Sequence, residues 1–190
     1  MKATNEIIFS EVPVVGLAAW SGTGKTSLMI KLIKLFRERG MNIGVIKHAH
    51  HDFEIDYPGK DSYEIRKAGA SRVLVGSEKR WALIAEQDEK KPLDFKEQLR
   101  LISMEPVDLI LVEGFKPESI PKIELHRPHL KKPLLYPDDS SIIAIATDSC
   151  DGFTADLPIL DLNNPEQIAE FIIDRFLTKH KINDYLTDRL

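Results

Sequence analysis

The sequence contains little cysteine, no long apolar run and no excess of positive charge. Cys150 is its single cysteine, so no disulfide can form within the chain, which indicates a reducing compartment. No uninterrupted apolar stretch is long enough to cross a bilayer, and residues 1–11 lack the basic start and apolar segment of a secretory signal. Together these absences predict a soluble cytoplasmic protein that does not enter membranes.

The charge balance argues against nucleic acid as the main ligand. The formal net charge is -4, without the broad basic patch that nucleic acid requires. No internal repeat or low-complexity tract is present. A length of 190 residues fits a single domain, and we expect its core over about 12–180, with 1–11 and 183–190 peripheral.

The most informative segment is a glycine-bearing turn between an apolar run and a helical run. It reads Ala19-Trp20-Ser21-Gly22-Thr23-Gly24-Lys25-Thr26. In this context the pattern predicts a P-loop, in which backbone N–H groups and the helix dipole converge on phosphate. Lys25 is expected to reach the β- and γ-phosphates, and the Thr26 hydroxyl to ligate Mg²⁺. Ala19 replaces the usual first glycine of the motif. Alanine fits at this position if the backbone there has a negative φ. The predicted nucleotide-binding residues here are Ser21, Gly22, Thr23, Gly24, Lys25, Thr26 and Ser27.

Short β-branched runs alternate with helical patterns along the chain. This alternation predicts an α/β protein with a mostly parallel sheet between two layers of helices, the three-layer P-loop fold. The expected strands are 12–19, 42–47, 107–112, 123–125, 142–146 and 158–160. The expected helices are 27–39, 62–68, 93–103 and 165 to about 179.

Two further apolar runs, 73–76 and 81–85, are joined by Ser77-Glu78-Lys79-Arg80. The pattern predicts a β-hairpin appended to the parallel core. The edge strand of a hairpin in a small domain has unpaired backbone groups that need a partner, and a second copy of the chain is able to pair with this edge. We therefore expect a homodimer.

A P-loop protein needs an acidic residue to hold Mg²⁺, and two candidates flank one apolar run. Glu113 ends this run and precedes Gly114, whereas Asp108 stands at its beginning. Because α/β sheets bind ligands at the carboxyl ends of their strands, Glu113 is the favoured metal residue. Lys116, just beyond, is expected to meet a phosphate or a second substrate, with a solvated loop lysine as the alternative.

The second strand is followed by Lys47-His48-Ala49-His50-His51-Asp52. Lys47 is expected to stabilise charge on a transferring phosphoryl group, and is a catalytic candidate together with Lys25. The spacing of His48, His50 and His51 differs from that of a zinc protease, and no cysteine is nearby. Metal binding is therefore disfavoured for these histidines; contacts to a substrate, phosphate or partner, and plain loop histidines, both stay open.

Two aspartates complete the candidates. Asp61 is expected to cap the helix over 62–68, with Glu64 as its capping-box partner, and a contact to Mg²⁺ through water is compatible with that cap. Asp148 follows the run 142–146, where a carboxylate is able to accept hydrogen bonds from guanine N1 and N2. The Asn-Lys pair of the familiar guanine motif does not precede it.

Six segments in this order resemble the molybdopterin-guanine dinucleotide biosynthesis protein B family. Besides the P-loop and the histidine segment, they are Gly59-Lys60-Asp61-Ser62-Tyr63, Arg66-Lys67-Ala68-Gly69-Ala70, Arg80-Trp81-Ala82-Leu83 and Val112-Glu113-Gly114-Phe115-Lys116. The resemblance covers about 14–172.

The resemblance implies a GTP-binding homodimer of the bacterial cytoplasm. Such a protein assists the guanylyltransferase that joins GMP to molybdopterin and hydrolyses GTP slowly with Mg²⁺. The wider group with dethiobiotin synthetase shares Mg²⁺ among a threonine, an aspartate and a glutamate, which by similarity are Thr26, Asp61 and Glu113. No residue stands out as a base to activate water, in keeping with an adapter.

Two other classes of function remain open from the sequence. One is an ATP-dependent small-molecule ligase similar to dethiobiotin synthetase. The other is a GTP-dependent metal-delivery protein that uses the histidine segment, as the nickel-delivery GTPase of urease suggests.

Overall fold

The computed structural model describes residues 12–49, 53–87, 93–149 and 154–177. The chain divides into two compact units, the first formed by Met1–His48 with Phe95–Leu190 and the second by Ala49–Asp94. The expectation of one domain over 1–190 stays a prediction. Among the described residues, no helix has the length and apolar character that a membrane crossing demands.

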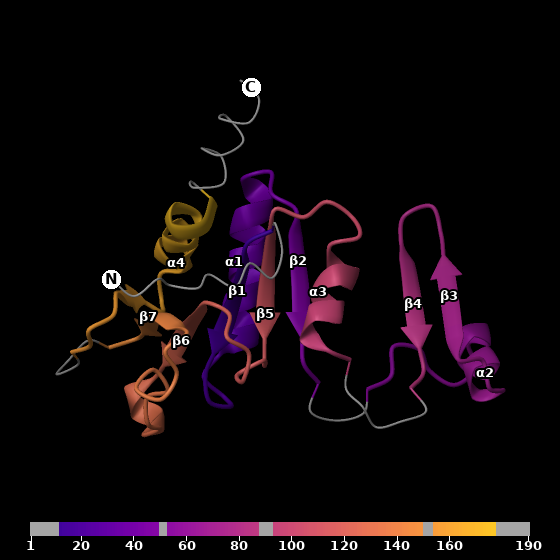
Figure 1. Cartoon of the computed structure of the whole chain (residues 1–190), viewed down its shortest axis with the longest axis horizontal. Helices are drawn as coiled ribbons and strands as arrows, with labels where there is room; N and C mark the ends of the chain where they lie inside the picture. Colours follow the sequence, from indigo (N-terminus) through magenta and orange to yellow (C-terminus); the bar gives the residue numbers. More distant parts are fainter. Residues whose placement is uncertain (1–11, 50–52, 88–92, 150–153, 178–190) are drawn as a thin grey trace. The chain divides into compact units, whose positions relative to one another are not determined.

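The first unit is built on a six-stranded parallel sheet with the order β2-β5-β1-β6-β7-β8. Figure 1 shows β5 and β2 running side by side in the same direction. The central strands β1 and β5 are buried along their whole length and apolar except for Glu113, the last residue of β5, as a sheet covered on both faces requires. The strands are β1 (Val14–Ala18), β2 (Ile43–Lys47), β5 (Leu109–Glu113), β6 (Lys122–His126), β7 (Ile142–Thr147) and β8 (Ile159–Asp161).

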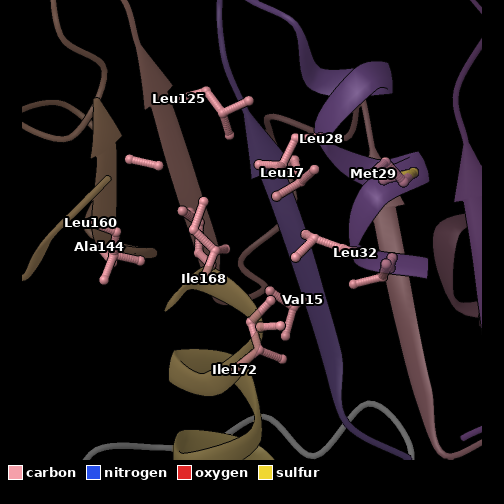
Figure 2. Packing of buried hydrophobic residues seen from close by; sticks show 14 of the residues in the cluster. Val15, Leu17, Leu28, Met29, Leu32, Leu125, Ala144, Leu160, Ile168 and Ile172 are labelled. Carbon is pink, nitrogen blue, oxygen red and sulfur yellow. The ribbon is translucent and has the colours of Figure 1, made fainter. Parts of the chain in front are cut away.

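Helices cover both faces of this sheet. On one face, α1 (Lys25–Glu38) and α4 (Pro165–Ile172) bury apolar side chains such as Leu32 and Ile168 against β1, β6 and β7 (Figure 2). On the other face, α3 (Phe95–Ile102) packs Phe95 and Leu99 against β5. The remaining helical turns are η1 (Pro128–Leu130) and η2 (Ile173–Leu177). The predicted α/β three-layer fold is therefore confirmed.

The second unit contains α2 (Asp61–Lys67) and the antiparallel hairpin of β3 (Arg72–Gly76) and β4 (Trp81–Ala85). The predicted hairpin and its turn are confirmed. Buried Arg66 organises this unit, because its guanidinium bonds to Asp56 at 2.7 Å, to Glu86 at 2.6 Å and to Glu54. These bonds raise the pKa of Arg66 above its usual value, so the guanidinium stays charged.

One detail of α2 differs from the prediction. Asp61 is the first helical residue rather than the N-cap, which is Lys60 in an extended conformation without a side-chain bond. Glu64 still turns back, but its carboxylate accepts the N–H of Gly59 at 3.3 Å. Asp61 in the first turn keeps a favourable position relative to the helix dipole.

Candidate nucleotide-binding site

The segment predicted to be a P-loop connects β1 to α1 through two glycines in the left-handed region. Gly22 has φ 80° and Gly24 has φ 103°, values that strain any other L-residue. Gly24 is the N-cap of α1 and offers no side-chain cap, so the first-turn N–H groups remain for a ligand. Lys131 is the only non-glycine with positive φ among the described residues, which confirms that Ala19 fits with a negative φ.

Lys25 is held within the loop. Its Nζ donates to the carbonyls of Ala19 at 3.1 Å and Trp20 at 3.2 Å. Burial lowers the pKa of Lys25 from its ordinary value; the carboxylate of Glu113 opposes this shift and the charge of Lys116 adds to it. An ammonium with reduced hydration and a nearby like charge gains from an incoming anion.

Glu113 lies where β5 ends, beside the P-loop. The Thr26 hydroxyl donates to its carboxylate at 3.1 Å, and Lys47 Nζ lies 3.7 Å from Glu113 Oε2. The sheet produces this grouping, because Glu113 is the register partner of both Leu17 in β1 and Lys47 in β2. Glu113 is only 9% exposed, so its charge is little screened.

The two oxygen-bearing side chains fit a magnesium ion. Mg²⁺ prefers hard oxygen ligands and keeps several waters beside a phosphate, so one hydroxyl and one carboxylate are a sufficient protein contribution. Thr26 and Glu113 provide these groups. No cluster of three or more His, Cys, Asp or Glu side chains suited to a metal occurs among the described residues.

The rival acidic residue, Asp108, precedes β5 at the amino-terminal edge of the sheet. Its Oδ2 accepts the N–H of Asn42 at 2.7 Å, which ties the start of β2 to the start of β5. The geometry therefore gives Asp108 a structural contact away from the P-loop.

His48 packs against the turn that follows Glu113. Its N–H donates to the Glu113 carbonyl at 2.9 Å, and its ring lies 5.1 Å from that of Phe115. Gly114 has φ 99°, and a Cβ added there would stand 3.1 Å from His48 Cβ. His50 and His51 lie outside the described residues, and the contacts predicted for them stay predictions.

Asp148 follows β7 and pairs with a residue that the sequence analysis missed. Its Oδ2 lies 2.5 Å from Arg127 and 3.8 Å from Nδ1 of His129. Arg127 also donates through Nε to the Thr23 carbonyl at 2.9 Å, so this ion pair contacts the P-loop backbone. Arg127 directly follows β6, and the strand-end argument that selected Glu113 applied to it equally.

The structure thus brings Lys25, Thr26, Lys47 and Glu113 together in the first unit. Asp61 belongs to the second unit, and its part in metal binding stays a prediction.

The comparisons place these features within a known family. The family model "Molybdopterin guanine dinucleotide synthesis protein B" matches residues 14–148. The molybdopterin-guanine dinucleotide biosynthesis adapter protein of Escherichia coli is 45% identical, over 86% of this chain and 93% of its own. The protein of the same name from Haemophilus influenzae is 41% identical, over 88% of this chain and 92% of its own.

A solved structure shares the fold. It is that of Bacillus subtilis MobB, which aligns with a TM-score of 0.67 and 22% identity over 86% of this chain and 97% of its own. Since the family model spans most of the chain and both relatives align over nearly their whole length, the chain belongs to the molybdopterin guanine dinucleotide synthesis protein B family.

Proposed function

We propose that this protein is a GTP-binding adapter that assists the attachment of GMP to molybdopterin. The observation that carries the proposal is the convergence of Lys25, Thr26 and Glu113 at an open helix N-terminus. Phosphate there meets backbone N–H groups and an ammonium, and Mg²⁺ meets a hydroxyl and a carboxylate. Two relatives named as adapters of molybdopterin-guanine dinucleotide biosynthesis support this pathway.

In the proposed complex, the remaining predicted residues have distinct roles. Backbone and side-chain groups of Ser21 to Ser27 hold the nucleotide phosphates, and Lys47 stabilises negative charge beside Glu113. We assign the carboxylate of Asp148, whose Oδ2 also forms the ion pairs with Arg127 and His129, to guanine N1 and N2. Lys116 meets a phosphate or a second substrate.

Hydrolysis of GTP in this proposal is slow. The carboxylate nearest the phosphates, that of Glu113, already accepts from Thr26 and faces Lys47, which suits metal binding better than proton abstraction. The useful output is therefore delivery of nucleotide to a guanylyltransferase in the cytoplasm, with His48 and the turn at Gly114 as part of the contact surface.

A homodimer is part of the proposal. One face of the hairpin exposes three large apolar side chains: Leu74 is 67% exposed, Trp81 57% and Leu83 47%. Leu74 stands directly opposite Leu83, so the three form one patch on a two-stranded sheet whose outer edges have backbone groups to pair. A second copy supplies an identical patch and strand edge, which explains why these residues are apolar.

The substitution Lys25→Ala tests nucleotide binding. We expect GTP affinity in the presence of Mg²⁺ to fall at least about tenfold, because a charge-assisted contact to phosphate is worth roughly 1.5 to 3 kcal/mol. Titration calorimetry with GTP and with ATP measures the loss and the base preference. The matched control is Lys34→Ala, which removes an exposed lysine from the same helix. Unchanged GTP affinity in Lys25→Ala would refute the P-loop assignment.

A further inference from the structure

Trp20, within the P-loop, is approached by two lysines from later loops. Its indole Nε1 donates to the Pro133 carbonyl at 2.8 Å, which fixes the plane of the ring. The ammonium of Lys116 lies 4.7 Å from the ring centre and that of Lys132 lies 5.8 Å from it. Both lysine side chains are exposed, so their charges are accessible to a ligand beside the P-loop.

The loop that carries Lys116 is anchored by a buried charge in β6. Lys122 is 2% exposed, and its Nζ donates to the carbonyls of Lys116 at 2.9 Å and Glu118 at 2.5 Å. The same ammonium contacts Asp139 at 3.0 Å and Ser141 at 2.7 Å. Four oxygen partners compensate for the cost of removing this charge from water, and they fix the backbone at Lys116.

The loop that carries Lys132 is anchored by a second buried charge two residues further along β6. Glu124 is fully buried, and its carboxylate accepts the N–H groups of Leu135 at 2.8 Å and Tyr136 at 2.9 Å. Residues two apart in a strand lie on the same face. One face of β6 therefore holds both loops in place and sets where the two lysines stand.

The positive charges near Trp20 are incompletely neutralised by the protein. Lys116 lowers the pKa of Lys25, which shows that these like charges interact. Glu113 faces Lys25 and Lys47 and is already shared between them. The charge of Lys116 also acts on the buried carboxylate of Glu124, whose pKa it lowers, but within the described ranges neither Lys116 nor Lys132 forms an ion pair closer than 4 Å with a carboxylate. An anion beside Trp20 relieves this repulsion.

We propose that Lys116 and Lys132 form a second phosphate site beside Trp20, next to the P-loop. Its ligand is a phosphate monoester dianion, carried by the molecule that is to receive the nucleotide. The P-loop holds the phosphates of the nucleotide, so a second site brings two phosphorylated molecules close together. Lysine suits this task as a mobile point charge that needs no fixed ligand geometry. The inference rests on the proposed function and deepens it.

The test separates the two possible sources of the phosphate. The full-length protein is saturated with GDP and Mg²⁺, and phenyl phosphate, a monoester on a planar ring, is titrated at constant ionic strength. Molybdopterin is titrated in a parallel arm. Lys132→Gln is expected to lower the affinity for phenyl phosphate and for molybdopterin about tenfold and to leave the affinity for GTP and GDP unchanged. The control Lys34→Gln removes one exposed lysine from α1 and should leave all four affinities as they are in the wild type.

Three results would overturn the second site. The first is that phenyl phosphate does not bind to the wild type. The second is that Lys132→Gln binds phenyl phosphate and molybdopterin as tightly as the wild type does. The third is that Lys132→Gln loses affinity for GTP but not for GDP. The last assigns the lysines to the γ-phosphate of the nucleotide. A failure of the proposed function is distinguishable, because it shows as wild-type GTP affinity in Lys25→Ala.

Discussion

At the scale of single residues, the two acidic side chains at the ends of one apolar run, Asp108 just before β5 and Glu113 at its last position, illustrate how position decides chemistry. Glu113 faces Thr26 at the carboxyl edge of the sheet, whereas Asp108 bonds to the backbone of Asn42 at the opposite edge. We expect Glu113→Gln to reduce Mg²⁺-dependent GTP affinity roughly tenfold, since the amide keeps the size but loses the charge that holds the metal and its waters. Asp108→Asn is expected to change it less than about twofold.

Titration of GTP with Mg²⁺ and with EDTA measures the metal-dependent part for each variant. A larger loss in Asp108→Asn than in Glu113→Gln would contradict the assignment. A loss in Glu113→Gln that persists in EDTA would indicate a structural role instead of metal binding.

The site residues differ in how far the sequence predicts them. Lys25 and Thr26 follow from a local motif, and Glu113 follows from its place at the end of an apolar run. Lys132 and Arg127 stand in a loop without periodicity, and their contacts to Trp20 and Thr23 depend on tertiary structure. Local patterns carry no information about such contacts, except that Arg127 directly follows a strand.

At the scale of elements, sequence patterns predicted the type of each α-helix and strand in the described ranges, but not all their ends, and the turn η1 lies in a segment expected to be a loop. The helix expected from Ser27 begins at Lys25, because Gly24 in the left-handed conformation allows the helix to start directly after it. The helix expected to reach about 179 ends at Ile172 and continues as a π-helical turn to Leu177, after which the described residues end. Ends depend on single backbone conformations, which periodicity does not report.

The buried charges of β6 were not predicted either. Lys122 and Glu124 flank Ile123 in β6, and the expectation of a strand over 123–125 said nothing about the burial of either charge. Both are buried because loops fold over that face and use the charges as anchors. Burial raises the pKa of Glu124, and the two backbone N–H groups oppose that shift.

The substitution Glu124→Gln tests the anchor. The substitution removes a buried charge, which is favourable. It also turns an amide NH₂ toward the N–H groups of Leu135 and Tyr136, which need an acceptor. We expect the second effect to dominate and the free energy of unfolding to fall by about 1 to 3 kcal/mol. Urea unfolding measures the change, with the exposed Glu38→Gln as control. Hydrogen exchange at Leu135 and Tyr136 should rise, and unchanged protection there would count against the anchor.

At the scale of the whole molecule, the proposed dimer depends on the apolar face of the hairpin. We expect Leu74→Glu to convert the protein to a monomer, since a charge in an apolar interface is left desolvated and unpaired. Sedimentation measures the mass. Leu101→Glu makes the same change at an exposed leucine of α3 and is expected to leave the mass as in the wild type. A monomeric wild type, or a dimeric Leu74→Glu, would contradict the proposal.

The order of the strands was beyond the reach of the sequence. The six-stranded sheet places β5 between β1 and β2, although the hairpin unit separates β5 from both along the chain. Strand order is decided by long-range pairing and by crossover handedness, which neither hydrophobic periods nor turn residues encode.

Because β5 follows the hairpin unit in the sequence, it is synthesised on the ribosome well after β1 and β2, the two strands with which it pairs. When residues 1–48 have been made, the P-loop, its helix and the strands β1 and β2 exist, but β5, the strand that joins them, is missing. The nascent chain must therefore keep two apolar strands unpaired until the hairpin unit and α3 have followed, which slows folding and exposes it to aggregation. Glu113 emerges with that same strand, so the metal site forms only when the sheet closes. A chain cut short in the hairpin unit would carry the P-loop motif without the sheet that holds it.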